Sequence, residues 1–166
     1  RLSLVGSEMC IRDRGKAAHS SMPHLGTNAV DILVDFVNEM KQEYKNIKEH
    51  DKVHELDAVP MIEKHLHRKI GEEESHIYSG FVMLNSVFNG GKQVNSVPHK
   101  ATAKYNVRTV PEYDSTFVKD LFEKVIRHVG EDYLTVDIPS SHDPVASDRD
   151  NPLIQNITRI APNYVH

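Results

Sequence analysis

Segments with helix-like and strand-like hydrophobic periodicity alternate along this chain, and their order limits the possible folds. Apolar residues recur every three or four positions over Asn28–Ile47 and again over Phe117–Val129, which predicts two amphipathic helices. Residues that favour strands occupy Gly80–Phe88, Ala101–Val107 and Leu134–Ile138. The predicted order is therefore helix, strand, strand, helix, strand.

One more strand before the first helix would complete a ferredoxin-like, split βαβ arrangement, which is an α+β fold. We therefore predict a four-stranded antiparallel sheet with two helices on one face and with its first strand missing or replaced. The alternation after Lys100 also predicts which side chains lie under the helices. These are Ala101, Ala103, Tyr105 and Val107, while Lys104, Asn106 and Arg108 lie on the open face.

The two ends of the chain lead us to expect a fragment. Residues 1–14, RLSLVGSEMCIRDR, resemble translated sequencing-adapter sequence, so we expect a foreign origin and a native start near Gly15. Alternatively, Glu8–Arg14 forms a short edge or replacement strand. Residues 50–79 are rich in His, Glu and Lys and are expected to be an insertion or flexible connection. Residues 140–166, with a helix start at Asn151, are expected to be a truncated return to another domain.

Composition excludes several classes of function. With 39% hydrophobic and 27% charged residues among 166, the chain is typical of a soluble globular protein, and no apolar run is long enough for a membrane span. The net charge of −4 offers no general attraction to nucleic acid or anionic lipid. A single cysteine, Cys10, permits neither an internal disulfide nor a cysteine-based zinc site, so we expect a cytoplasmic location.

Three segments carry residues suited to chemistry. Gly15–Pro23 places His19 among small residues before the first helix, and Gly90–Pro98 places Asn95 in a loop that begins with two glycines. Asn106–Pro111 ends a strand with Arg108, which could bind a carboxylate through two parallel hydrogen bonds. Each segment taken alone is more simply a surface loop, a hairpin loop or a surface arginine.

Taken together, GKAAHSSMPHLGTNAV, FNGGKQVNSVP and YNVRTVPEYD resemble the dimerisation (lid) domain of the zinc-dependent aminoacylase and carboxypeptidase family. That family includes carboxypeptidase G, acetylornithine deacetylase and succinyl-diaminopimelate desuccinylase, and the chain most resembles the desuccinylases. The resemblance runs from Gly15 to the end of the chain. It implies that residues 15–139 form the lid domain and that residues 140–166 return toward a catalytic domain.

The resemblance also implies functional roles. His19 would reach into the partner subunit of a homodimer and stabilise the oxyanion, whereas Asn95 and Arg108 would hold the carboxylate of the substrate. That substrate would be an N-acyl amino acid, such as N-succinyl-diaminopimelate of lysine biosynthesis, or a dipeptide. Two zinc ions, or cobalt, would be held by a catalytic domain outside this chain, which contains no His-x-Asp pair. The fragment alone is expected to bind no metal and to be inactive.

Other polar groups and other functions are weaker hypotheses. We expect Glu72–Glu74 to be a solvated acidic turn and His65 and His67 to lie on a helix without sharing a face. One alternative function is a free-standing ferredoxin-like binding module, but an RNA reader needs aromatic residues on the open face, and Tyr105 is predicted on the covered face. The other alternative is a purely structural dimerisation element.

Overall fold

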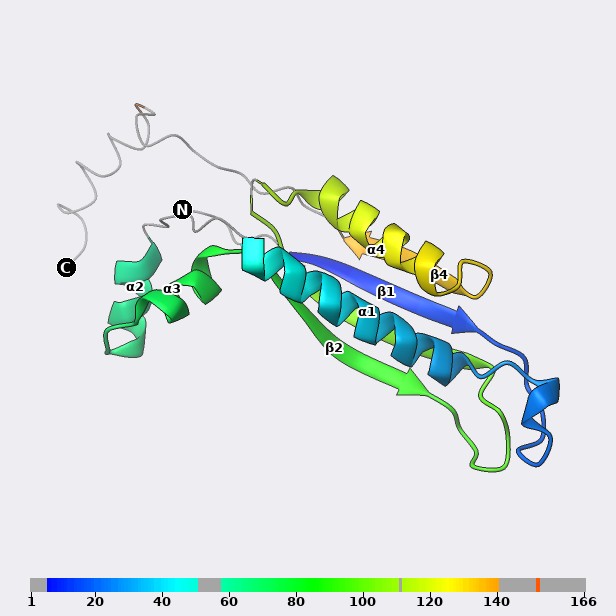
Figure 1. The fold of residues 1–166 in the computed structure, drawn as a ribbon. Coiled ribbons are helices and arrows are strands. Elements are labelled where there is room, and N and C mark those ends of the chain that lie inside the picture. Colours follow the sequence, from blue (N-terminus) through cyan, green and yellow to red (C-terminus); the bar gives the residue numbers. More distant parts are fainter. Residues whose placement is uncertain (1–5, 51–57, 111, 141–151, 153–166) are drawn as a thin grey trace.

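The computed structural model describes residues 6–50, 58–110, 112–140 and 152 (Figure 1). Two long helices, two short helices, a short 3-10 helix and four strands make up the described chain. In order they are β1 (Gly6–Arg14), η1 (Pro23–Leu25), α1 (Ala29–His50), α2 (Ala58–Leu66), α3 (Glu72–Ser79), β2 (Val82–Gly90), β3 (Lys100–Arg108), α4 (Ser115–Val129) and β4 (Leu134–Ser140).

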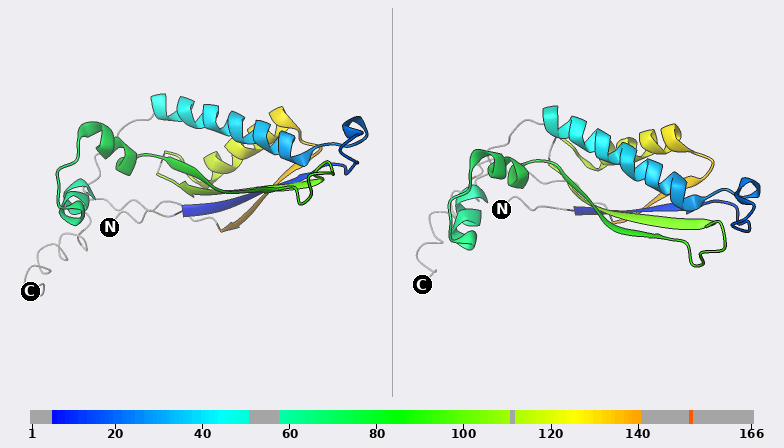
Figure 2. Two further views of the ribbon diagram at one scale, coloured as in Figure 1. Left: turned by 90° about the horizontal axis from the view of Figure 1, so that it is seen from below. Right: turned by 60° about the horizontal axis from the view of Figure 1, so that its bottom comes forward.

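The four strands form one antiparallel sheet in the order β2-β3-β1-β4. Helices α1 and α4 cover one face of this sheet and leave the other face open, as the two views of Figure 2 show. The predicted α+β, ferredoxin-like sandwich is therefore confirmed. Its two layers bury one hydrophobic core between the helices and the sheet.

The first strand of the fold is present and central. Strand β1 pairs with β3 along its whole length, from Gly6 opposite Arg108 to Arg14 opposite Lys100, and with β4 on its other side. Of the two alternatives for Glu8–Arg14, the replacement strand in the first-strand position is confirmed and the edge strand is wrong. The reason is that Met9 and Ile11 are fully buried under the helices, which a central strand requires. The foreign origin of residues 1–14 stays a prediction.

Both long helices begin as the sequence predicts, and α1 continues to His50, beyond the predicted end at Ile47. The side chain of Asn28 accepts a hydrogen bond from the Val30 amide at 3.0 Å, and Asp114 caps α4 by accepting one from the Phe117 amide at 2.9 Å. Gly130 ends α4. The alternation in β3 is confirmed too, since its predicted inward residues are buried. They are Ala101, Ala103, Tyr105 and Val107.

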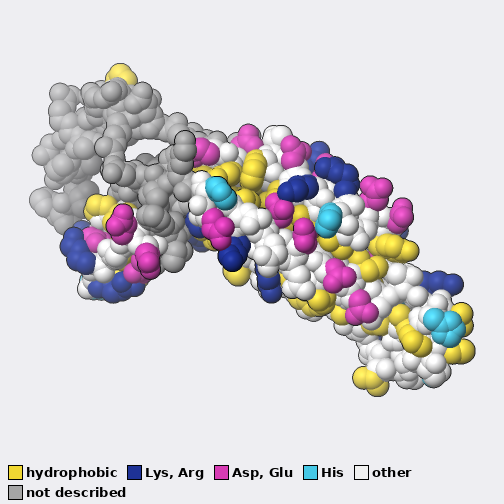
Figure 3. Space-filling model, viewed as in Figure 1, with side chains coloured by type: hydrophobic (Ala, Val, Ile, Leu, Met, Phe, Trp, Pro, Cys, Tyr) yellow, Lys and Arg dark blue, Asp and Glu magenta, His cyan; other side chains and the backbone are white. Residues whose placement is uncertain are grey.

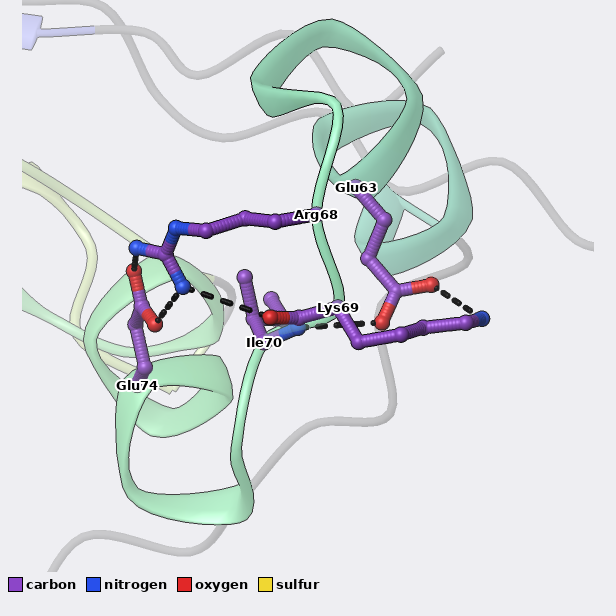
Figure 4. A network of polar contacts seen from close by, with 5 residues as sticks. All are labelled: Glu63, Arg68, Lys69, Ile70 and Glu74. Atoms are coloured by element: carbon purple, nitrogen blue, oxygen red, sulfur yellow. Dashed lines mark hydrogen bonds and ion pairs between the residues drawn. The ribbon is translucent and has the colours of Figure 1, made fainter.

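Two short helices occupy most of the predicted connection at residues 50–79, and ion pairs tie each of them to the loop between them (Figure 4). Arg68 binds Glu74 through two hydrogen bonds of 2.6 and 2.7 Å. Glu63 accepts a hydrogen bond from Lys69 at 2.7 Å and one from the Ile70 amide at 3.1 Å, and these contacts lower the pKa of the Glu63 carboxyl. Local polar contacts therefore hold this segment where its hydrophobic pattern is weak.

Two expectations about this segment need correction. Glu72–Glu74 is the first turn of α3 after Gly71 and not an acidic turn, and negative side chains are favourable at a helix N-terminus. His65 lies in α2 as predicted, but His67 follows the end of that helix with a φ of 54°. Both histidines are exposed.

Within the described part of the chain, no helix combines the length and the apolar character needed to span a bilayer. The predicted helix after Asn151 and the predicted return at 140–166 lie outside the described residues, apart from 140 and 152.

Candidate functional site

Two loops meet at one end of the sheet and form the feature that we call the tip, residues 15–28 and 91–99 (Figure 1). The first loop closes on itself, because the Thr27 amide donates to the Lys16 carbonyl at 2.8 Å. It then pairs with the second loop, because the Val97 amide donates to the Ala18 carbonyl at 2.8 Å. The tip is thus a backbone-bonded extension of the sheet.

The first loop of the tip depends on a glycine where the loop folds back on itself. A Cβ atom on Gly26 would lie 2.7 Å from the Lys16 carbonyl oxygen and 2.9 Å from the Cβ of Ala18. Since real Cβ atoms do not approach so closely, only glycine fits without moving the backbone. In the other loop Gly91 has a φ of +69°, the left-handed region in which a side chain is strained.

His19 and Asn95 lie together at the tip. His19 forms an antiparallel bridge with Ser96, and the amide of the next residue, Ser20, donates to the Asn95 carbonyl at 3.0 Å. The side chains of His19 and Asn95 are both exposed. Nδ1 of His19 lies 2.8 Å from the Ser21 hydroxyl. The structure therefore brings the backbone of His19 and that of Asn95 close together in the tip, with both side chains exposed to solvent.

Arg108 lies at the opposite end of the sheet, which we call the base. It is opposite Gly6 on one side and Val82 on the other. Strand β4 ends at this level too, because Ser140 is opposite Glu8. The nine residues of β3 separate Lys100 beside the tip from Arg108 by about 26 Å at 3.3 Å per residue. Within one chain, the structure brings together two of the three predicted site residues and not the third.

The tip has further features that the sequence motifs did not single out. Three large apolar side chains are exposed on it, Met22, Leu25 and Val94, and Figure 3 shows hydrophobic side chains gathered at this end of the molecule. Beside the loop 91–99 lies a cavity of about 450 Å³ whose lining includes Lys92, His99 and Lys100 and no acidic residue. Only the fold brings these groups together, so their spacing in the sequence carried no signal.

The described residues contain no cluster of metal-binding side chains, and the central strands expose no aromatic side chain. The described residues contain no group of three or more His, Cys, Asp or Glu side chains that could hold a metal ion. Strands β1 and β3 expose no aromatic side chain on the open face, since Tyr105 lies in the core. Burial raises the pKa of the Tyr105 hydroxyl, which has no hydrogen-bond partner among the described residues.

A second polar group is buried on the covered face. Asp13 of β1 is 2% exposed, and neither of its carboxylate oxygens has a hydrogen-bond partner among the described residues. Burial raises the pKa of this carboxyl from 3.8 to about 6, although the Arg14 amide lowers it in part. Asp13 faces the helices and takes no part in the exposed surface of the tip.

Comparison with known proteins shows the family to which the chain belongs. The family model described as "Peptidase dimerisation domain" matches residues 8–134. A Staphylococcus epidermidis protein named "Probable succinyl-diaminopimelate desuccinylase" is 96% identical over 162 residues, 97% of this chain and 40% of that protein. A Staphylococcus aureus protein of the same name is 45% identical over 161 residues, 96% of this chain and again 40% of that protein. The chain thus spans about two fifths of the length of these relatives.

Solved structures show the same fold. An M20 family metallo-carboxypeptidase from Sulfolobus solfataricus aligns with a TM-score of 0.62 at 19% identity, over 98% of this chain and 50% of that one. An aminopeptidase PepT from Bacillus cereus aligns with a TM-score of 0.57 at 15% identity, over 95% of this chain and 35% of that one. From the family match and the shared fold, the chain belongs to the M20 peptidase dimerisation domain family.

Proposed function

We propose that this chain is the lid and dimerisation domain of a cytoplasmic, metal-dependent amide hydrolase. The reaction would remove an N-acyl group, foremost N-succinyl, from an amino acid such as diaminopimelate. The names of the two staphylococcal relatives support this substrate class, and the family supports a role in dimerisation. Because the chain spans 40% of those relatives, the reaction would belong to the longer protein.

The position of Arg108 relative to His19 and Asn95 is the observation that carries the proposal. The two tip residues and the base residue are separated by the length of β3, so they cannot contact one small substrate within a single lid. A two-fold dimer resolves this separation, because it can place the tip of one subunit over the base of the other. A homodimer therefore follows from the geometry if all three residues serve one reaction.

The base also indicates which subunit each residue serves. Arg108 lies opposite Gly6 at the base, far from the tip, and the family resemblance implies that the tip residue His19 reaches the partner subunit. We therefore assign Arg108 to the active site of its own subunit and His19 and Asn95 to the site of the partner subunit. Arg108 and Asn95 would bind the substrate carboxylate, and His19 would donate a hydrogen bond to the developing oxyanion.

The metal ions of the proposed hydrolase do not fit the described residues. No group of donors in the described part of the chain could hold zinc or cobalt. We therefore place the two ions in the remainder of the longer protein and derive no step of the reaction through them. The part of the chemistry that these residues can supply is orientation of the substrate and stabilisation of negative charge.

Substitution of His19 in the full-length Staphylococcus epidermidis relative tests this function. His19→Ala is expected to lower turnover of an N-succinyl amino acid about 100-fold or more, because one preorganised donor to an oxyanion contributes on that order. The metal content, measured by elemental analysis, and the dimer mass should stay unchanged. Unchanged turnover would remove His19 from the reaction and favour the purely structural dimerisation element.

Mixing two inactive variants tests the assignment to subunits. A heterodimer of His19→Ala and Arg108→Ala subunits contains one site with both residues intact if His19 acts on the partner's site and Arg108 on its own. Random mixing should then restore about a quarter of the wild-type activity, since about half of the dimers are mixed and each has one intact site. If both residues serve the same subunit, no site is complete and mixing restores nothing.

A further inference from the structure

Two groups of Ser21 contact one nitrogen of the His19 ring. The backbone amide of Ser21 donates to Nδ1 of His19 at 3.2 Å, and the Ser21 hydroxyl lies 2.8 Å from the same atom. A turn makes these contacts possible, because the Met22 amide donates to the His19 carbonyl at 2.9 Å and brings Ser21 back over the ring. The neighbouring serine, Ser20, instead directs its amide to the other loop of the tip.

The direction of the backbone contact determines the state of the ring. A backbone N–H can only donate a hydrogen bond, so Nδ1 must present its lone pair to Ser21. In a neutral imidazole one nitrogen accepts and the other carries the proton. The proton therefore belongs on Nε2, and the Ser21 hydroxyl can add a second hydrogen bond to the lone pair of Nδ1.

We propose that Ser21 is a positioning residue that holds His19 in the tautomer with the proton on Nε2. This inference rests on the proposed function, in which His19 donates a hydrogen bond to an oxyanion. The opposite tautomer would present the lone pair of Nε2 to negative charge and would repel it. Only the tautomer that Ser21 favours gives the exposed side of the ring a donor.

The rest of the tip keeps the donor in one place. Hydrogen bonds from Val97 to Ala18 and from Ser20 to Asn95 fix the backbone on both sides of His19. With the backbone fixed and Nδ1 held by Ser21, the ring loses its freedom about χ1 and χ2 before any substrate arrives. Such preorganisation is what makes a hydrogen-bond donor effective toward a transition state.

Nitrogen-15 NMR of the imidazole rings in this chain tests the tautomer directly. At alkaline pH, where the rings are neutral, the His19 signal should show a protonated Nε2, with His19→Gln identifying the signal among the 11 histidines. Ser21→Ala should raise the ratio of the Nδ1-protonated tautomer to the Nε2-protonated tautomer roughly two- to tenfold, which corresponds to the loss of one hydrogen bond. Ser21→Thr should restore the wild-type ratio, and Ser20→Ala is the matched control without effect. A wild-type ring protonated on Nδ1, or a ratio unmoved in Ser21→Ala, would overturn the inference.

Kinetics of the full-length Staphylococcus epidermidis relative separate this inference from the proposed function. Ser21→Ala should lower kcat roughly two- to tenfold with KM nearly unchanged, because the donor acts on the transition state and not on substrate binding. Ser21→Thr should recover kcat. If His19→Ala abolishes turnover while Ser21→Ala changes neither tautomer nor kcat, the inference about Ser21 fails and the function of His19 stands. If His19→Ala has no effect, the proposed function itself fails.

Discussion

Asp13 gives the structure a measurable dependence of stability on pH. Its carboxylate is 2% exposed on the covered face of β1, and neither oxygen has a hydrogen-bond partner among the described residues. Burial raises the pKa of this carboxyl from its ordinary 3.8 to about 6. Removing a charge from water without a partner is costly, so the folded state favours the protonated form.

The sign of the effect follows from proton binding in the two states. Between pH 3.8 and about 6 the folded protein keeps the proton on Asp13 while the unfolded chain releases it, so the free energy of unfolding falls as the pH rises. Above pH 6 the carboxyl is ionised in both states and the full penalty remains. The difference between the two pKa values corresponds to about 3 kcal/mol of lost stability at pH 7.

Urea unfolding between pH 4 and pH 7 measures this penalty. Asp13→Asn removes the charge with little change of shape, so the stability of the wild type should fall by about 2 kcal/mol relative to this variant across that range. Asp13→Val also removes the unpaired polar atoms and suits a central strand, so it should raise the free energy of unfolding at pH 7 by about 3 kcal/mol. The matched control is Asp137→Asn on β4, whose exposed carboxylate pairs with Arg12 at 3.2 Å and should contribute little. Parallel pH profiles of wild type and Asp13→Asn would refute the reasoning, because they would mean that the Asp13 carboxylate is solvated or paired.

Three other substitutions have expected outcomes of known sign. Tyr105→Phe removes a buried hydroxyl without a partner and keeps the ring that packs on Phe122 at 5.2 Å, so thermal unfolding should show stability unchanged or higher by about 1 kcal/mol. Gly26→Ala presses a Cβ against Lys16 and Ala18 of its own loop and, less closely, against the Val97 side chain, and it should cost about 1 to 3 kcal/mol, with faster hydrogen exchange at the Val97 amide as the local sign. Asp114→Ala removes the cap of α4 and should cost about 1 kcal/mol in urea unfolding, whereas Asp114→Asn should cost less.

The parts of the fold with regular hydrophobic periodicity were predictable from the sequence. The helix after Asn28 and the helix after Asp114 carry clear apolar stripes, and both appear with the predicted caps. In β3, strict alternation fixed the covered and open faces because a shift by one residue would expose the whole apolar set. Burial of one face is therefore the physical reason why these predictions succeeded.

Elements held by polar contacts were harder to predict. Helices α2 and α3 are each tied to the loop between them, by the Glu63–Lys69 and Arg68–Glu74 pairs, which hydrophobic periodicity does not reveal. The place of β1 was left open between an edge strand and a replacement for the first strand, for another reason. Only Met9 and Ile11 mark its covered face with apolar residues, and Asp13 interrupts the alternation with a charge. When a charged residue occupies a buried position, the alternation of apolar and polar residues no longer predicts reliably where the strand lies in the sheet.

The candidate site was predictable as a set of residues but not as an arrangement. Sequence motifs singled out His19, Asn95 and Arg108, and the backbone bonds of the tip bring the first two together. The separation of Arg108 follows from the length of β3, because nine extended residues lie between the glycine-rich loop and this arginine. The length of β3 could thus be estimated from the sequence, but the motifs alone did not use it to place Arg108 relative to the other two residues.

The separation of the tip from the base connects the fold to the proposed dimer. The nine-residue strand β3 separates the tip from the base at the other end of the sheet. A lid built in this way holds its tip away from the site that its own base serves. Its two ends can therefore act on one substrate only when a second lid, turned by two-fold symmetry, brings its tip to the base of the first. Dimerisation would then be a condition for assembling the site, and a full-length variant that stays folded but monomeric should lose the same turnover as His19→Ala.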